Sequence, residues 1–116
     1  MSRSRGAAAV RLDEAAPLFA ALGDETRLRI VTRLCAEGPL SIARLSEGTP
    51  ITRQAVTRHL ESLAGAGLVT DSWQGRERVW ELAPKRLEKA RLCLDRISEQ
   101  WDAAIDRLQD LIERDP

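Results

Sequence analysis

The last third of the chain carries a heptad pattern that limits the folds open to it. Between Pro84 and Glu113, apolar side chains recur every seven residues in two series: Leu87, Leu94, Trp101 and Leu108, and Ala90, Ile97, Ala104 and Leu111. Two apolar positions per heptad predict an α-helix of about 30 residues, roughly 45 Å long. A 116-residue globule covers only part of such a helix. We expect the rest of the stripe to pack on a second copy of the chain; the alternative is packing on the protein's own first helix.

Length and composition describe one small domain. Of the 116 residues 43% are hydrophobic, and Lys+Arg and Asp+Glu both number 18. Balanced charge argues against a coat that binds nucleic acid without regard to sequence. Every apolar run is far shorter than the roughly 18 residues that a membrane crossing requires, so we expect a cytoplasmic protein without membrane contact. Two cysteines, Cys35 and Cys93, are too few for a disulfide framework or a four-cysteine zinc site.

Helical periodicity runs through the first part of the chain. Residues 1–11 are small, basic and aperiodic, which predicts a disordered tail. Residues 12–22 predict a first helix. Its apolar stripe would consist of Leu12, Ala15, Ala16, Phe19 and Leu22. Asp24 is a suitable N-cap for a second helix that ends at Gly38-Pro39. The apolar face of this second helix would consist of Leu28, Ile30, Val31, Leu34 and Cys35.

Two short helices and a hairpin come next. Ser41 can cap a helix from Ile42 to Glu47, and Thr52 can cap another that runs to about Ala64. The tight turn between them makes this pair a helix-turn-helix. After Gly67 the apolar period falls to near two, which predicts a β-hairpin at residues 69–82, the wing of a winged helix. We therefore predict a mainly α winged helix-turn-helix, with its core at residues 12–83 and a long C-terminal dimerisation helix at residues 84–116.

The second helix of a helix-turn-helix reads DNA when its N-terminal, outward side chains carry donors that reach base edges in the major groove. Arginine can fork onto guanine, glutamine can pair with adenine, and a threonine methyl can meet a thymine methyl. The residue types around the start of this helix suit that chemistry. The candidate DNA-binding residues are Thr52, Arg53, Gln54, Thr57, Arg58 and His59 in the helix and Arg76 and Arg78 in the wing, while Val56, Leu60 and Leu63 face inward.

Residues 15–113 resemble the ArsR/SmtB family of bacterial winged-helix repressors. The stretches that carry the resemblance are Phe19-Ala20-Ala21-Leu22-Gly23-Asp24-Glu25-Thr26-Arg27, Thr52-Arg53-Gln54-Ala55-Val56-Thr57-Arg58-His59-Leu60, Gly67-Leu68-Val69 and Val79-Trp80-Glu81-Leu82. The resemblance implies a homodimer that pairs through its first and last helices and binds an inverted repeat in its own promoter region. The expected dimer contacts are Phe19, Leu87, Leu94, Ile97, Trp101, Ala104, Leu108 and Leu111.

Metal sensing is not expected of this chain. Metal-sensing members of the family carry a Cys-x-Cys stretch at the start of the third helix, where this sequence has Leu40-Ser41-Ile42-Ala43, or histidine and carboxylate ligands on the last helix, which here has no histidine. The final helix, with Trp101 followed by Asp106-Arg107-Leu108, is similar to a branch of the family that does not sense metals. We expect neither a metal site nor a cofactor. No effector can be named from the sequence.

Two alternatives stay open besides a dimeric repressor. Some family members sense persulfides or oxidants with one cysteine on the second helix and one on the last, and Cys35 and Cys93 lie on those two elements. A winged helix can also serve as a protein-docking module, although outward Arg and Gln at the start of the recognition helix argue against this use. An enzyme is not expected, because the single histidine has no evident nucleophile, carboxylate pair or phosphate loop to work with.

Overall fold

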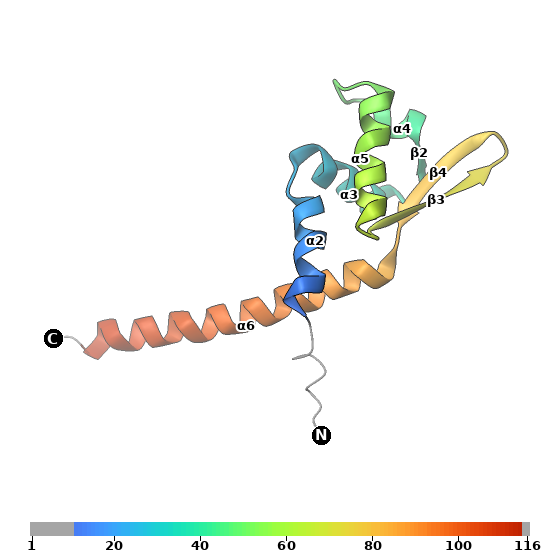
Figure 1. The fold of residues 1–116 in the computed structure, drawn as a ribbon. Coiled ribbons are helices and arrows are strands. Elements are labelled where there is room, and N and C mark those ends of the chain that lie inside the picture. The colour runs from blue at the N-terminus through green and yellow to red at the C-terminus, as the bar shows by residue number, and fades with distance from the viewer. Residues whose placement is uncertain (1–10, 115–116) are drawn as a thin grey trace.

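The computed structural model describes residues 11–114, which form a small winged helical domain and one long helix that extends away from it (Figure 1). The helices are α2 (Leu12–Leu22), α3 (Glu25–Glu37), α4 (Ile42–Ser46), α5 (Arg53–Gly65) and α6 (Pro84–Arg114). The strands are β2 (Leu40–Ser41), β3 (Val69–Gln74) and β4 (Glu77–Leu82). The predicted bounds of the helices agree with these to within a residue, and the mainly α fold with a small β-sheet is confirmed.

Side-chain caps explain where three of the helices begin. The Asp24 carboxylate accepts the backbone N–H of Arg27 at 3.0 Å, and the hydroxyls of Ser41 and Thr52 accept those of Arg44 and Ala55 at 3.2 and 3.1 Å. Each of these bonds satisfies a backbone donor that has no partner inside its own helix. The predicted caps are thus confirmed, and they fix the register of α3, α4 and α5.

The sheet has one strand more than the predicted hairpin. Its order is β2-β4-β3, with antiparallel neighbours, and the two residues of β2 pair with β4 through Leu40↔Trp80 and Ser41↔Val79. The sequence analysis treated Ser41 only as a cap and assigned no strand there. The short β2 strand ties the start of α4 to the base of the wing, so the helix-turn-helix and the hairpin share one hydrogen-bonded framework.

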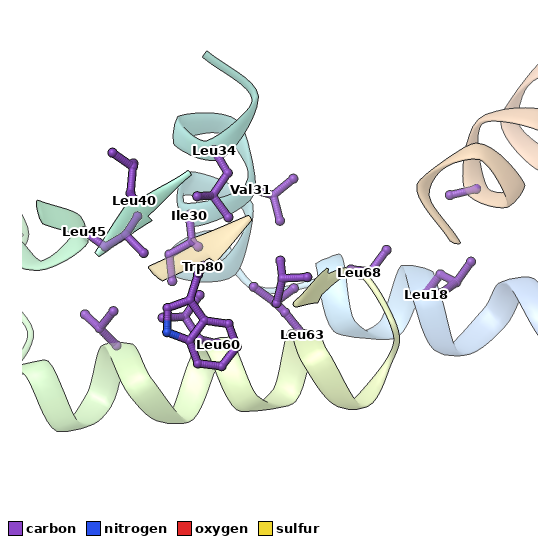
Figure 2. Packing of buried hydrophobic residues seen from close by; sticks show 13 residues of the cluster. Leu18, Ile30, Val31, Leu34, Leu40, Leu45, Leu60, Leu63, Leu68 and Trp80 are labelled. Atoms are coloured by element: carbon purple, nitrogen blue, oxygen red, sulfur yellow. The ribbon is translucent and has the colours of Figure 1, made fainter. Parts of the chain in front are cut away.

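The hydrophobic core lies between the sheet and α3, α4 and α5, with α2 closing one side (Figure 2). Trp80 is 1% exposed, and Leu18, Leu60, Leu63 and Leu68 are fully buried. Two predicted apolar faces need correction. On α2 the buried residues are Ala15 and Leu18, whereas the predicted stripe residues Leu12 and Ala16 are exposed.

The predicted face of α3 was also too wide. Ile30, Val31 and Leu34 are buried as expected, but Leu28 is 48% exposed and Cys35 is exposed. The core covers only the strip of α3 formed by Ile30, Val31 and Leu34. Leu28 and Cys35 are seven residues apart, so they lie on the same edge of that strip, where they face solvent. Apolar identity predicted the direction of the face correctly and overestimated its width.

Helix α6 makes the molecule elongated. The first half of α6 crosses α2. At the crossing Ala90 and Cys93 are buried, and Lys89 Nζ lies 3.2 Å from Glu14 Oε1. Beyond that crossing it extends from the domain (Figure 1). The radius of gyration is 18.8 Å, against about 13 Å for a compact chain of this size. Although α6 is long, no helix among residues 11–114 is apolar enough over a sufficient length to cross a membrane.

Candidate nucleic-acid interface

Helix α5 is positioned by its buried side. Val56, Leu60 and Leu63 are 1%, 0% and 0% exposed, and they pack in the common core. Residues at this spacing lie along one face of a helix, so their burial also determines which residues point outward. The outward set includes Arg53, Gln54 and Arg58, all of which are exposed.

The start of α5 offers free donors at its surface. Arg53 and Arg58 take part in none of the ion pairs formed within residues 11–114, so their guanidinium groups are available to an outside acceptor. The two threonines are engaged instead. Thr52 Oγ1 caps the helix, and the Thr57 hydroxyl donates to the carbonyl of Arg53 at 2.9 Å. The Thr52 hydroxyl only accepts in its bond and can still donate, and a contact of either threonine methyl with thymine stays a prediction.

His59 is held against α3 rather than left free. Its Nδ1 lies 3.3 Å from Nη1 of Arg27 and 3.9 Å from Oδ2 of Asp24, and its side chain is 25% exposed. The Arg27 guanidinium also donates through Nε to the carbonyl of Ala21. His59 thus packs on the start of α3, and a phosphate contact by His59 stays a prediction that this geometry does not favour.

The wing carries one free and one engaged arginine. Arg76 follows Gly75, whose φ of 64° places it in the left-handed region that the turn between β3 and β4 requires, and Arg76 is exposed. Arg78 is half-buried. Its Nε lies 2.5 Å from Asp71 Oδ2, and its guanidinium carbon lies 4.7 Å from the centroid of the Trp80 ring. The structure therefore brings Arg76 to the tip and fixes Arg78 on the body of the wing.

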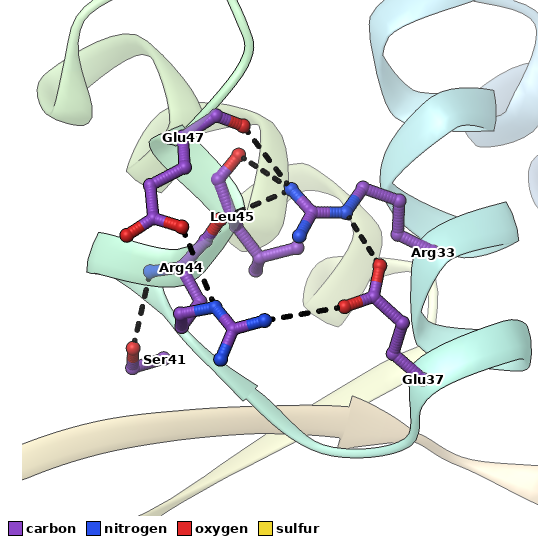
Figure 3. A network of polar contacts seen from close by, with 6 residues as sticks. All are labelled: Arg33, Glu37, Ser41, Arg44, Leu45 and Glu47. Atoms are coloured by element: carbon purple, nitrogen blue, oxygen red, sulfur yellow. Dashed lines mark hydrogen bonds and ion pairs between the residues drawn. The ribbon is translucent and has the colours of Figure 1, made fainter.

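A network that the sequence analysis missed supports the helix-turn-helix (Figure 3). Arg33 lies on α3, and its Nη1 donates to the carbonyls of Arg44, Leu45 and Glu47 at 3.0, 3.3 and 3.4 Å, at the C-terminal end of α4. Glu37 lies 3.0 Å from Arg33 Nε. The i,i+4 spacing of Arg33 and Glu37 is a visible sequence signal, but the contact with α4 is not, because it depends on how the two helices pack.

The long stripe on α6 is partly used within the chain. Phe19 and Leu87 are half-buried against the core, and Ala104 is half-buried on α6. The other residues predicted for the dimer contact are exposed: Leu94, Ile97, Trp101, Leu108 and Leu111 at 52%, 45%, 66%, 58% and 61%. The alternative that the whole stripe packs on the chain's own first helix is therefore wrong, because α2 covers only the first part of α6.

The two cysteines lie in different environments. Cys35 is exposed on α3, Cys93 is buried on α6 beside the α2 crossing, and both are free thiols. Among residues 11–114, no three histidine, cysteine, aspartate or glutamate side chains are grouped so that they could hold a metal ion. The surface at the start of α5 carries outward arginine, glutamine and threonine side chains beside a hairpin, as in a winged helix-turn-helix that binds DNA.

Comparison with known proteins shows which family of proteins the chain resembles. Residues 22–71 match a family model described as a helix-turn-helix domain. The HTH-type transcriptional regulator Rv2034 of Mycobacterium tuberculosis is 42% identical over 80% of this chain and 83% of its own length. The arsenical resistance operon repressor of Escherichia coli is 32% identical over 82% of this chain and 79% of its own.

Solved structures agree with these relatives. An ArsR-like transcriptional regulator from Rhodococcus sp. RHA1 superposes with a TM-score of 0.67 at 35% sequence identity, covering 85% of this chain and 92% of that one. The fold and the exposed face of α5 define a DNA-binding winged helix-turn-helix protein. The chain belongs to the ArsR family of transcriptional regulators, and it is a regulator rather than an enzyme.

Proposed function

We propose that this regulator is a homodimeric repressor that binds an inverted repeat upstream of its own or a neighbouring operon. The observation that carries the proposal is the two-faced helix α5, which buries Val56, Leu60 and Leu63 and leaves Arg53, Gln54 and Arg58 free outside. Such an arrangement suits docking in the major groove, where arginine and glutamine can each make paired hydrogen bonds to one base.

The wing adds a second point of contact in this proposal. Arg76 at the tip approaches the phosphate backbone, whereas Arg78 acts mainly by holding Asp71 and Trp80 together so that the tip keeps its place. Phosphate contacts fix the register of a protein on DNA without reading the sequence. Base preference is thus assigned to α5, and general affinity to the wing.

Dimerisation is supported by the exposed stripe on α6. Five large apolar residues of the two heptad series are each more than two-fifths exposed on the part of the helix beyond Cys93. An apolar face of this length on an otherwise charged helix is typical of a helix that packs on a partner. A second copy related by a two-fold axis would place two α5 helices in successive major grooves, about one helical turn of DNA apart.

The test is a footprint on the DNA upstream of the gene, with unlabelled random DNA as competitor and a salt series. We expect protection of a pseudo-palindrome that survives competitor and weakens steeply as salt rises, because phosphate contacts release counterions. A reporter driven by that promoter should be less active when the protein is present. Equal binding to random DNA would overturn the operator proposal, and a more active reporter would assign activation instead of repression.

A further inference from the structure

The wing carries a tryptophan that contributes little to the core. Trp73 on β3 is 68% exposed, whereas Trp80 on β4 is 1% exposed. In the hairpin register Trp73 lies opposite Arg78 and Asp71 lies opposite Trp80. Directly opposed residues of an antiparallel pair point to the same side, so these four side chains share one face of the wing. Near the core this face is buried at Trp80, and near the hairpin tip it carries the exposed indole of Trp73.

Trp73 is the outermost side chain that β3 places on this face. The side chains nearer the base of the wing contact one another, because Arg78 binds Asp71 through Nε and stacks over the Trp80 ring. The next position of the strand on the same face is Gly75, which has no side chain. The indole is therefore exposed beyond the Arg78–Asp71 ion pair and beside the turn, whose other residue is the exposed Arg76.

The position of the wing indicates which partner that is. The N-terminal end of α5 and the tip of the hairpin lie on the same side of the domain, away from α6 (Figure 1). A second copy that packs along the α6 stripe would leave Trp73 uncovered. A DNA duplex that takes the start of α5 into one major groove would instead run on toward the wing and present its adjoining minor groove there.

We propose that Trp73 packs its indole against the deoxyribose walls of that minor groove and donates its Nε1–H to a base acceptor inside. The inference deepens the operator binding proposed above and rests on it. An A·T pair shows only acceptors in the minor groove, whereas the amino group of guanine stands in the way of an inserted group. An amphipathic indole fits this narrow, acceptor-lined groove. Trp73 accordingly gives the regulator a preference for A·T pairs in the flank of each half-site.

The contact proposed for Trp73 differs from that of Arg76 because the indole carries no charge. Arg76 is the phosphate contact proposed above, and the exposed Glu77 beside it weakens its field. The contribution of Trp73 should therefore be nearly independent of salt. A contribution from Arg76 should instead change the slope of affinity against salt, because a phosphate contact releases a counterion.

The experiment titrates the footprinted operator with wild type, Trp73→Ala, Trp73→Phe and Ser72→Ala over a salt series. Ser72 is the matched control, because it is exposed on the same strand and points to the opposite face. Two operators are used, one with A·T pairs and one with G·C pairs in the flanks. We expect Trp73→Ala to lose about tenfold in affinity for the A·T operator with an unchanged salt slope. It should bind both operators alike, while Trp73→Phe keeps part of the affinity and Ser72→Ala keeps all of it.

Three results would overturn the inference. If Trp73→Ala binds the A·T operator as wild type does, the indole is exposed for some other partner. If Ser72→Ala loses as much affinity as Trp73→Ala, the losses reflect a disturbed hairpin rather than the indole. In both cases wild type still selects the operator, and the proposed function stands. If wild type itself does not distinguish the operator from random DNA, the proposed function and this inference fail together.

Discussion

Arg27 and His59 contact each other across 32 positions of sequence, with Nη1 of the arginine 3.3 Å from Nδ1 of the imidazole. A guanidinium can only donate, so His59 accepts on Nδ1 and its neutral form carries the proton on Nε2. The same arginine donates through Nε to the carbonyl of Ala21 near the end of α2. One side chain at the start of α3 thus joins the end of α2 to the middle of the recognition helix α5, on the side opposite the exposed arginines.

The stability of this junction should depend on pH through Asp24. Its carboxylate caps α3, and the hydrogen bond from the Arg27 backbone N–H is the main reason that the pKa of Asp24 lies below its ordinary value. A carboxyl with a lower pKa in the folded state adds stability above its unfolded pKa, and that stability is lost as the pH falls through the folded value. We expect the free energy of unfolding to fall with acid below about pH 4.

Asp24→Asn separates the charge from the cap. The amide oxygen can still accept the Arg27 N–H, so α3 keeps an N-cap, but the side chain no longer titrates. In urea unfolding between about pH 3 and pH 7, the variant should lose less stability on acidification than wild type. Parallel pH profiles for the two proteins would show that the Asp24 charge has no part in acid unfolding.

The contact of Arg33 with the end of α4 should contribute to the free energy of unfolding. Arg33→Ala removes a donor shared by three carbonyls and the partner of Glu37. A hydrogen bond of a charged group contributes about 1.5 to 3 kcal/mol. Because the three carbonyls share one Nη1, we expect a loss of about the size of one such bond in the free energy of unfolding.

A second arginine on the same helix is the control for that variant. Among residues 11–114 Arg29 pairs only with Glu25, at the surface, where the Arg29 side chain is 71% exposed. Exposed pairs of this kind contribute less than about 1 kcal/mol. Equal losses for Arg29→Ala and Arg33→Ala in urea unfolding would contradict the assigned role of Arg33.

Two glycines at the end of α5 should respond to alanine with opposite signs. Gly67 has a φ of +81°, and a Cβ there would lie 2.8 Å from Cγ of Arg86. Gly67→Ala should therefore cost about 1 to 2 kcal/mol from backbone strain, in addition to the displacement of Arg86. Gly65 is helical and its Cβ position is open, so Gly65→Ala should stabilise by up to about 1 kcal/mol. Thermal unfolding of the pair checks both signs, and a stabilised Gly67→Ala would exclude this account of the turn.

Base reading by α5 makes a prediction that separates specificity from affinity. Arg53→Ala and Gln54→Ala should each cost about 1 to 3 kcal/mol of operator binding and relax the base preference, while Arg76→Ala should weaken binding to all sequences alike. Ser62→Ala, exposed near the other end of α5, is the control and should leave binding unchanged. Competition titrations with operator and random DNA distinguish the classes. The assignment of readout to α5 fails if all three variants lose equally on both DNAs.

The stripe on α6 predicts which substitutions dissociate the protein. Leu108 is 58% exposed in the single chain, and Leu108→Asp would place a charge in the proposed interface, where an unpaired charge is costly. We expect the dimer dissociation constant to rise by about 100-fold or more while the fold of residues 12–83 is kept. Gln109→Asp adds the same charge one position away from the stripe and should leave the dimer intact. Sedimentation equilibrium measures both, and a dimeric Leu108→Asp would exclude this face.

How far the sequence predicts this molecule depends on the range of each interaction. The caps at Asp24, Ser41 and Thr52 act within three residues, and they were predicted correctly. The pairing of Leu40 with Trp80 and the donation from Arg33 to the end of α4 join distant segments, and they were missed. Periodicity gave the direction of the buried faces of α3 and α5, but on α2 it omitted Leu18, which is fully buried. The width of a buried face depends on neighbours that periodicity does not describe, which is why Leu28 and Cys35 were wrongly assigned to the apolar face of α3.

In the candidate site, too, short-range features could be predicted from the sequence and long-range contacts could not. The outward position of Arg53, Gln54 and Arg58 follows from the 3.6-residue period of α5 alone, and the structure places them as expected. The sequence could not indicate that Arg78 would be bound to Asp71 or that His59 would face Arg27, because both depend on side-chain packing. Their direct contact with DNA stays a prediction that the footprint variants can test.

If the uncovered part of α6 forms the proposed dimer, the amount of this protein in the cell becomes part of its control. In the proposed dimer each operator takes up two chains, so below the dissociation constant of the pair, occupancy rises with the square of chain concentration. Above that concentration the rise becomes proportional. Substitutions at Trp101 or Leu111 would then change the protein concentration at which the promoter is repressed, although neither residue would contact a base. The choice of promoter would depend on α5.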